Sequence, residues 1–313
     1  MTWQVLISAP YLLPALDQFR PRLESVGIEV LTVPVHERLS EEELLAVVPT
    51  IDGAICGDDQ FTERVLREAH RLKVISKWGT GIDSIDTRAA SRLGIRVCNV
   101  PEAFTDPVAD SVLGYILCFA RRLPWMDRDV RRGLWQKSHS VALRECTLGI
   151  VGVGSIGKAV ARRAITFGMT VLGNDRVPMS AGFLDETGIT MVSLRELLAG
   201  ADFVSLNCDL NPTSLHLIDG AALACMKRSA YLINTARGPL IDEPALVTAL
   251  RESRIAGAAL DVFETEPLPA DNPLRSFDEC LLAPHNANSS PTARELVHER
   301  AVSSLLHGLR DHG

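Results

Sequence analysis

The stretch Thr147–Arg163, TLGIVGVGSIGKAVARR, decides the fold of the residues around it. Its first part, Thr147–Val151, is an apolar run that predicts a buried strand, and the residues after the glycines have the composition of a helix. Asp175 ends a second apolar run, Thr170–Asn174, and lies 18 residues after the last glycine. Three glycines between strand and helix follow the spacing GxGxxG: Gly152, Gly154 and Gly157. This order of strand, glycine turn, helix, strand and acid is typical of a Rossmann βαβ unit.

The glycine turn predicts a binding site for a dinucleotide. A tight turn at the N-terminus of a helix presents backbone N–H groups to a pyrophosphate, and a side chain at Gly154 would keep the phosphate away. Asp175 can accept the hydroxyl groups of a ribose and would repel a 2′-phosphate, which favours NAD over NADP. Arg176 leaves that choice open, because an arginine can accept a phosphate. The alternative is that Gly152 and Gly157 only allow the strand and the helix to pack closely.

Short apolar runs alternate with helical stretches along the whole chain, which predicts an α/β fold with parallel sheets. Before Pro101 the predicted strands are Val5–Ser8, Val30–Val33, Gly53–Cys56, Lys73–Ser76 and Arg96–Val100, and the helices between them include Glu41–Val48 and Thr62–Arg71. Two helical stretches follow, Val108–Arg122 and Trp125–Lys137. The second series of strands is Thr147–Val151, Thr170–Asn174, Phe203–Asn207, Tyr231–Asn234, Ala258–Val262 and Cys280–Ala283, and a last helix is predicted at Pro291–Leu309.

Length and composition agree with two globular domains and exclude several classes of protein. At roughly 150 residues per domain, 313 residues predict two. The net charge of −7 leaves no broad basic surface for nucleic acid or an anionic membrane. No apolar stretch is long enough to span a bilayer, and the N-terminal residues lack the pattern of a signal peptide. The 7 cysteines are scattered without a CxxC pair, which predicts no metal site, no disulfide framework and a cytoplasmic location.

Three reactive side chains belong to the second series of strands. Arg237, Glu266 and His285 each lie a few residues past the end of a predicted strand. In an open parallel sheet, ligands bind beyond the carboxyl ends of the strands, so we expect the three at the edge that carries the glycine turn. Taken singly, each has a simpler interpretation: a surface arginine, a turn glutamate and a loop histidine.

Together these side chains fit hydride transfer between NAD and a 2-hydroxy acid. Taking a hydride from C2 requires removal of the hydroxyl proton, and imidazole is the side chain best suited to this near neutral pH. A guanidinium binds the substrate carboxylate through a planar, bidentate pair of donors. A carboxylate hydrogen-bonded to the imidazole fixes its orientation and favours its charged form. We therefore predict that His285 is the acid/base, that Arg237 binds the carboxylate and that Glu266 supports His285.

The motifs of the chain, in their order, resemble those of the D-isomer-specific 2-hydroxyacid dehydrogenase family, with phosphoglycerate dehydrogenases as the nearest type. They are Lys73–Asp83, the glycine turn, Asn234–Gly238 (NTARG), Ala259–Phe263 (ALDVF) with Glu266-Pro267, and Pro284-His285. The resemblance implies the same three catalytic residues. It implies that NAD is surrounded by Gly152, Gly154, Ser155, Ile156, Gly157, Asp175, Cys208, Thr235 and Asp261, with Asp261 facing the carboxamide and Thr80 near the cofactor. Backbone N–H groups of the substrate loop, with Gly79 and Gly81, would bind the substrate carboxylate.

The family resemblance also implies an architecture of two Rossmann-like or flavodoxin-like domains with a cleft between them. The expected substrate-binding domain is residues 1–98 plus 287–313, and the expected NAD-binding domain is residues 99–286. A homodimer is expected, with Trp125 and Trp135 at its interface; the alternative is an amphipathic helix packed within one chain. Because the sequence stops at Gly313, we expect no regulatory domain.

The substrate beyond its 2-oxo or 2-hydroxy acid group stays open. Where phosphoglycerate enzymes carry an arginine after the third strand, this chain has Asp58 and Asp59, which would repel a phosphate monoester. Lys77 would supply one positive charge to the substrate, or is an ordinary surface lysine. The sequence also has Asp110-Ser111 in place of a common Glu-His pair. We expect 3-phosphoglycerate, hydroxypyruvate or glyoxylate among the candidates.

A second class of function is an NAD-sensing, corepressor-like binding protein of the same fold. Such a protein would use NAD to control its association rather than to turn over a substrate. The sequence lacks long disordered tails and keeps Arg237, Glu266 and His285, which favours the enzyme. A methyltransferase with the same glycine turn would leave these three side chains unexplained.

Overall fold

The computed structural model describes residues 2–311 and divides into two compact units. Unit 1 contains the residues up to Phe104 together with those from Ser290 onward, and unit 2 is Thr105–Ser289. The ends of the predicted domain ranges, Met1 and residues 312–313, lie outside the described residues. Each unit has its own parallel sheet, which confirms the predicted class of two parallel-sheet α/β domains.

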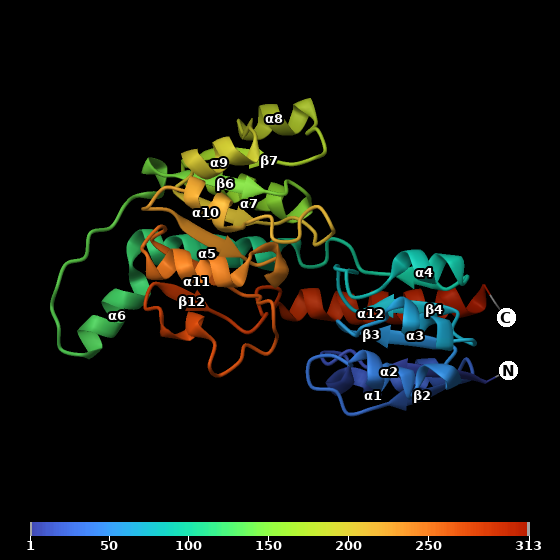
Figure 1. Cartoon of the computed structure of the whole chain (residues 1–313). Coiled ribbons are helices and arrows are strands. Elements are labelled where there is room, and N and C mark those ends of the chain that lie inside the picture. The colour runs from blue at the N-terminus through green and yellow to red at the C-terminus, as the bar shows by residue number, and fades with distance from the viewer. Residues whose placement is uncertain (1, 312–313) are drawn as a thin grey trace. The chain divides into compact units, whose positions relative to one another are not determined.

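Unit 1 is built on five strands in the order β2-β1-β3-β4-β5, the flavodoxin-like order. They are β1 Trp3–Ile7, β2 Ile28–Thr32, β3 Gly53–Cys56, β4 Val74–Lys77 and β5 Arg96–Cys98. The helices are α1 Leu16–Glu24, α2 Glu41–Leu45, α3 Glu63–Glu68, α4 Thr87–Arg92 and α12 Pro291–Arg310. Figure 1 shows α12, in red, beside β3 and β4, so the last helix of the chain completes the domain that the first residues form.

Unit 2 is built on seven parallel strands in the order β12-β11-β10-β9-β6-β7-β8. They are β6 Thr147–Val151, β7 Thr170–Asn174, β8 Thr190–Met191, β9 Phe203–Leu206, β10 Tyr231–Asn234, β11 Gly257–Leu260 and β12 Cys280–Leu282. This is a Rossmann sheet, in which the strand order reverses between the first strand, β6, and its neighbour β9. Ligands of such sheets bind outside the carboxyl ends of the strands at this reversal.

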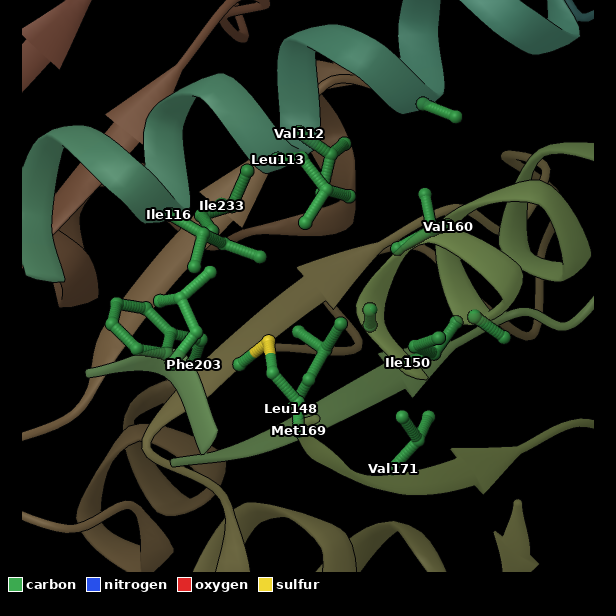
Figure 2. Packing of buried hydrophobic residues seen from close by; sticks show 14 of the residues in the cluster. Val112, Leu113, Ile116, Leu148, Ile150, Val160, Met169, Val171, Phe203 and Ile233 are labelled. Carbon is green, nitrogen blue, oxygen red and sulfur yellow. The ribbon is translucent and has the colours of Figure 1, made fainter. Parts of the chain in front are cut away.

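Helices cover both faces of the unit 2 sheet. The helices of unit 2 are α5 Thr105–Arg121, α6 Leu123–Arg131, α7 Ser155–Thr166, α8 Ala181–Thr187, α9 Leu194–Gly200, α10 Gly220–Cys225 and α11 Glu243–Arg251. Figure 2 shows Val112 and Ile116 of α5 and Val160 of α7 directed at Leu148 and Ile150 of β6. On the other face, α9, α10 and α11 supply the apolar side chains of a second cluster. Because both faces are buried, the strands are continuous apolar runs, which is why the sequence predicts them well.

Some predicted elements were wrong in extent. The helix predicted at Trp125–Lys137 ends at Arg131, because Gly133 takes a left-handed backbone, with φ of 79°, and closes the helix. The helix predicted at Glu41–Val48 ends at Leu45, and Val48 instead begins a separate 3-10 helix, Val48–Thr50. The short edge strand β8 was not predicted. Across residues 2–311, the structure contains no helix long and apolar enough to cross a membrane.

Candidate active site

The glycine turn after β6 requires glycine at two positions for different reasons. Gly152 has φ of 87°, and a Cβ there would lie 2.5 Å from the backbone nitrogen of Cys208. A Cβ on Gly157 would lie 2.1 Å from the carbonyl oxygen of Gly152. At Gly154, by contrast, a Cβ would meet nothing within 4 Å, so the backbone at the start of α7 borders open space. This space beside a helix N-terminus is where a pyrophosphate binds in a Rossmann unit.

Asp175 connects the second strand to the glycine turn. Its Oδ2 accepts the Val153 N–H at 2.6 Å, and its Oδ1 accepts the Val177 N–H at 2.8 Å. Each carboxylate oxygen has a further lone pair, so the group can also accept ribose hydroxyls. Arg176 extends to the loop after β9, where its Nη1 donates to Thr213 Oγ1 at 2.7 Å. The two loops that flank β6 are therefore linked, with Asp175 beside the turn.

Two further side chains near the turn bear on whether a dinucleotide fits. Thr235 is 8% exposed, and its hydroxyl is buried. This hydroxyl has no hydrogen-bond partner within residues 2–311. A buried polar atom of this kind normally has a partner, so a ligand that supplies one fits here. Cys208 lies against Gly152, and burial raises the pKa of its thiol to about 11, so the thiol stays neutral. An orphaned hydroxyl, an open turn and a carboxylate together fit a dinucleotide.

His285 and Glu266 form a direct pair. The Nδ1 atom of His285 lies 2.9 Å from Oε2 of Glu266, and both side chains are partly buried. The other carboxylate oxygen, Oε1, accepts the Phe263 N–H at 2.9 Å, which fixes the plane of the carboxylate. The ionised carboxylate accepts a hydrogen bond from the Nδ1–H group, and this tautomer leaves Nε2 as the atom that can exchange a proton with a substrate.

Arg237 lies on a loop that packs tightly against the loop of Glu266. A Cβ on Gly238 would lie 1.9 Å from the carbonyl carbon of Phe263, so only glycine allows the two loops to approach this closely. Asn234 Nδ2 donates to the Arg237 carbonyl oxygen at 2.8 Å, and Arg237 Nη1 donates to the carbonyl oxygen of Ala236 at 2.8 Å. Arg237 follows β10, and β10, β11 and β12 are neighbours, so the three predicted side chains come from one end of three adjacent strands.

Asp261, predicted to face the nicotinamide carboxamide, is 1% exposed and contacts the loop that follows His285. Its Oδ1 accepts the Asn286 N–H at 2.9 Å and its Oδ2 accepts the Ala287 N–H at 2.8 Å. The pKa of Tyr115 on α5 is raised to about 12, mainly by burial of the phenol and secondly by the negative charge of Asp261. The sequence did not indicate these contacts with the backbone after His285.

Four of the predicted residues, Lys77, Gly79, Thr80 and Gly81, lie in unit 1. Gly79 has φ of 129°, and its carbonyl oxygen accepts the Val100 N–H at 2.8 Å. The Thr80 hydroxyl donates to the Val100 carbonyl oxygen at 3.0 Å, and Gly81 follows. The interpretation of Lys77 as a surface lysine was wrong: it is 4% exposed, because it ends the inner strand β4, and its Nζ lies 3.1 Å from Asp58 Oδ1. Asp58 therefore offsets the one positive charge predicted near the substrate.

The comparison with protein families matches residues 113–287 to the NAD binding domain of the D-isomer specific 2-hydroxyacid dehydrogenases. A glyoxylate reductase of Thermofilum pendens is 40% identical over 296 residues, covering 90% of this chain and 86% of the relative. The chain belongs to this family. A D-3-phosphoglycerate dehydrogenase of Methanocaldococcus jannaschii is 39% identical over 293 residues, 92% of this chain, and the chain spans only 55% of that relative.

Solved structures agree with this family. A D-lactate dehydrogenase of Aquifex aeolicus, complexed with NAD and lactic acid, has a TM-score of 0.87 at 28% identity and covers 98% of this chain and 96% of its own. An NADPH-dependent glyoxylate/hydroxypyruvate reductase of Sinorhizobium meliloti has a TM-score of 0.82 at 28% identity, covering 96% and 92%. The dehydrogenase is thus an NAD(P)-dependent oxidoreductase of 2-hydroxy acids. These relatives give no support to the corepressor-like alternative.

Proposed function

We propose that the dehydrogenase interconverts 2-oxo acids and D-2-hydroxy acids with NAD(H), using His285, Glu266 and Arg237. The observation that carries this proposal is the 2.9 Å contact between His285 and Glu266 on a loop system that also holds Arg237. In the reduction, Nε2 of the imidazolium donates a proton to the C2 oxygen, and Glu266 stabilises the charged ring. Arg237 binds the substrate carboxylate through two parallel donors. The bound nicotinamide supplies or accepts the hydride at C2.

The cofactor residues proposed from the sequence keep their roles, with the exception of Asp261. The backbone of the glycine turn, with Ser155 and Ile156, binds the pyrophosphate, and Asp175 accepts the ribose hydroxyls. Thr235 supplies its buried hydroxyl to the cofactor, and Cys208 packs beside it. Two features support NAD over NADP. Asp175 would lie where a 2′-phosphate brings negative charge, and the two charges would repel each other. Arg176, which could bind such a phosphate, is hydrogen-bonded to the loop after β9.

For the substrate we propose an unphosphorylated 2-oxo acid such as glyoxylate or hydroxypyruvate. Unit 1 then acts as the substrate-binding domain, with Gly79 and Gly81 presenting N–H groups to the carboxylate and Thr80 near the cofactor. The ion pair of Lys77 with Asp58 supports this choice, because a lysine already neutralised attracts a phosphate monoester poorly. Unit 2 is the NAD-binding domain.

A substrate panel tests the proposed function. Oxidation of NADH would be followed with glyoxylate, hydroxypyruvate, pyruvate, phenylpyruvate and 3-phosphohydroxypyruvate, and repeated with NADPH. We expect the highest kcat/KM with glyoxylate or hydroxypyruvate and NADH. A higher kcat/KM for 3-phosphohydroxypyruvate, or for NADPH over NADH, would contradict the substrate or the cofactor preference respectively. Failure of the whole panel despite binding of NADH would contradict the reaction itself.

We also propose that the dehydrogenase is a cytoplasmic homodimer. The segment around α6 exposes several large apolar side chains, with Trp135 at 86% exposure and, less fully exposed, Leu123, Val130, Leu134 and Val141. Apolar side chains that gather on one exposed segment are typical of an interface. None of the 7 cysteines forms a disulfide, which supports a reducing compartment.

Sedimentation equilibrium tests the dimer. We expect a mass twice the 34.1 kDa of one chain, and a shift toward the monomer in the double variant Leu134→Ser/Trp135→Ser. Phe167→Ser, which removes an exposed apolar side chain elsewhere in unit 2, is the matched control and stays dimeric. A monomeric wild-type protein, or a double variant as dimeric as the control, would contradict this interface.

A further inference from the structure

The loop that carries His285 is held by hydrogen bonds to one buried residue, Asp261. Asp261 accepts the N–H groups of Asn286 and Ala287 through its two side-chain oxygens, at 2.9 and 2.8 Å. Its carbonyl oxygen accepts the N–H of His285 itself at 2.7 Å. Three consecutive backbone donors, beginning at the predicted acid/base residue, therefore bond to a single residue that is 1% exposed.

This support matters because the backbone of His285 is strained. Its φ is 48°, in the left-handed region that residues other than glycine seldom adopt. Such a conformation persists only when the surrounding structure holds it. Asp261 is itself fixed, because its N–H donates to the carbonyl oxygen of Asn234 at the end of β10. The strain at His285 is thus opposed by bonds to the rigid end of the sheet.

Ser111 holds the same loop from the helix side. Its hydroxyl on α5 lies 3.1 Å from the carbonyl oxygen of Ala287 and 3.0 Å from that of Pro107. The neighbouring residue, Asp110, accepts from Arg163 of α7 at 2.7 Å, which fixes this part of α5 on the domain. The pair Asp110-Ser111, which stands in place of a common Glu-His pair, therefore has a structural role: it fixes α5 and the loop after His285.

We propose that Asp261 is a positioning residue that sets the imidazole of His285 through the backbone of residues 285–287, with Ser111 as the second anchor of this loop. The proposal rests on the proposed role of His285. It differs from a role of Asp261 as a ligand of the nicotinamide carboxamide, because a positioning residue acts on the proton transfer and a ligand acts on cofactor binding.

Asp261→Asn is the first test. An amide turns its NH₂ group toward one of the two backbone donors, so one N–H loses its acceptor and the loop shifts. A small misplacement of an acid/base group costs about 100-fold in rate, and we expect kcat to fall by about that factor. The Kd of NADH, measured by fluorescence titration, is expected to stay within about twofold, a range that corresponds to less than half a kcal/mol.

A double-mutant cycle separates positioning from general damage. In the His285→Asn background, which tolerates the left-handed backbone, Asp261→Asn is expected to change kcat by no more than about threefold. Asp202→Asn is the matched control: Asp202 accepts the Thr147 N–H at 2.8 Å at the amino end of the strands, away from the site, so the variant loses stability but keeps kcat. A full further loss of kcat in the His285→Asn background would overturn the proposal.

Ser111 gives a second, milder test that holds even where Asp261→Asn folds poorly. Ser111→Ala removes one neutral hydrogen bond, and kcat is expected to fall about fivefold with an unchanged Kd for NADH. Ser111→Thr keeps the hydroxyl and is expected to restore kcat. Equal loss in the Thr and Ala variants, or wild-type kcat in both, would contradict the role of Ser111 as an anchor.

The outcomes distinguish this inference from the proposed function. If Asp261→Asn weakens NADH binding about tenfold and leaves kcat at saturating NADH intact, Asp261 is a cofactor ligand and the inference fails while His285 keeps its role. If His285→Asn alone retains wild-type kcat, the proposed function fails, whatever Asp261 does. Loss of kcat in Asp261→Asn, absent in the His285→Asn background, supports both.

Discussion

His285→Ala is expected to lower kcat by about 10³-fold, because general acid–base catalysis by a positioned side chain contributes roughly that factor. In the proposed reaction the imidazole supplies the proton to the C2 oxygen, and its Nδ1 atom lies 2.9 Å from Oε2 of Glu266. NADH binds through the glycine turn and Asp175, so its Kd is expected to stay within about twofold of the wild-type value. Steady-state kinetics with glyoxylate and fluorescence titration with NADH measure the two quantities.

The left-handed backbone of His285 requires a matched control. Alanine adopts this backbone less readily than histidine or asparagine, so part of a loss in His285→Ala could come from a distorted loop. His285→Asn keeps a residue that tolerates the conformation and removes the acid/base group, and it is expected to lose kcat to a similar extent. Wild-type kcat in either variant would show that the proton comes from elsewhere.

Arg237→Lys is expected to lower kcat/KM for the 2-oxo acid by roughly 50-fold, since a bidentate bond to a carboxylate is replaced by one point charge. The Kd of NADH stays nearly unchanged, because the change lies on the substrate side of the proposed site. Arg275→Lys is the control: Arg275 binds the carbonyl oxygens of Leu268 and Pro269 in an exposed loop and is expected to retain wild-type kinetics. Unchanged kcat/KM in Arg237→Lys would remove Arg237 from the substrate site.

The strands of unit 2 follow from the sequence because burial on both faces of a parallel sheet leaves an apolar run that is hard to misplace. Thr147–Val151, Thr170–Asn174 and Tyr231–Asn234 were predicted with the bounds that the structure shows. Helix ends were predicted less well. They depend on single backbone conformations, such as that of Gly133, which residue type alone indicates weakly.

The sequence predicts the reactive side chains of the candidate site, but not the hydrogen bonds that hold their loops in place. Glu266 and His285 follow neighbouring strands, so the carboxyl-edge rule places them near each other. The bonds of Asp261 to the loop after His285 depend on where backbone N–H groups point, and that information lies in the fold rather than in the residue types. The burial of Lys77 was missed for a related reason, because a lysine at the end of the inner strand β4 is buried only through the packing around that strand.

A crystal structure of the ternary complex with NADH and oxamate tests the central claim most directly. The account predicts Nε2 of His285 about 3 Å from the oxygen that replaces the C2 oxygen of the substrate, with both oxygens of the analogue's carboxylate on the guanidinium of Arg237. Glu266 would keep its contact with Nδ1 in the complex. An imidazole turned away from that oxygen, with the carboxylate bound elsewhere, would contradict the account.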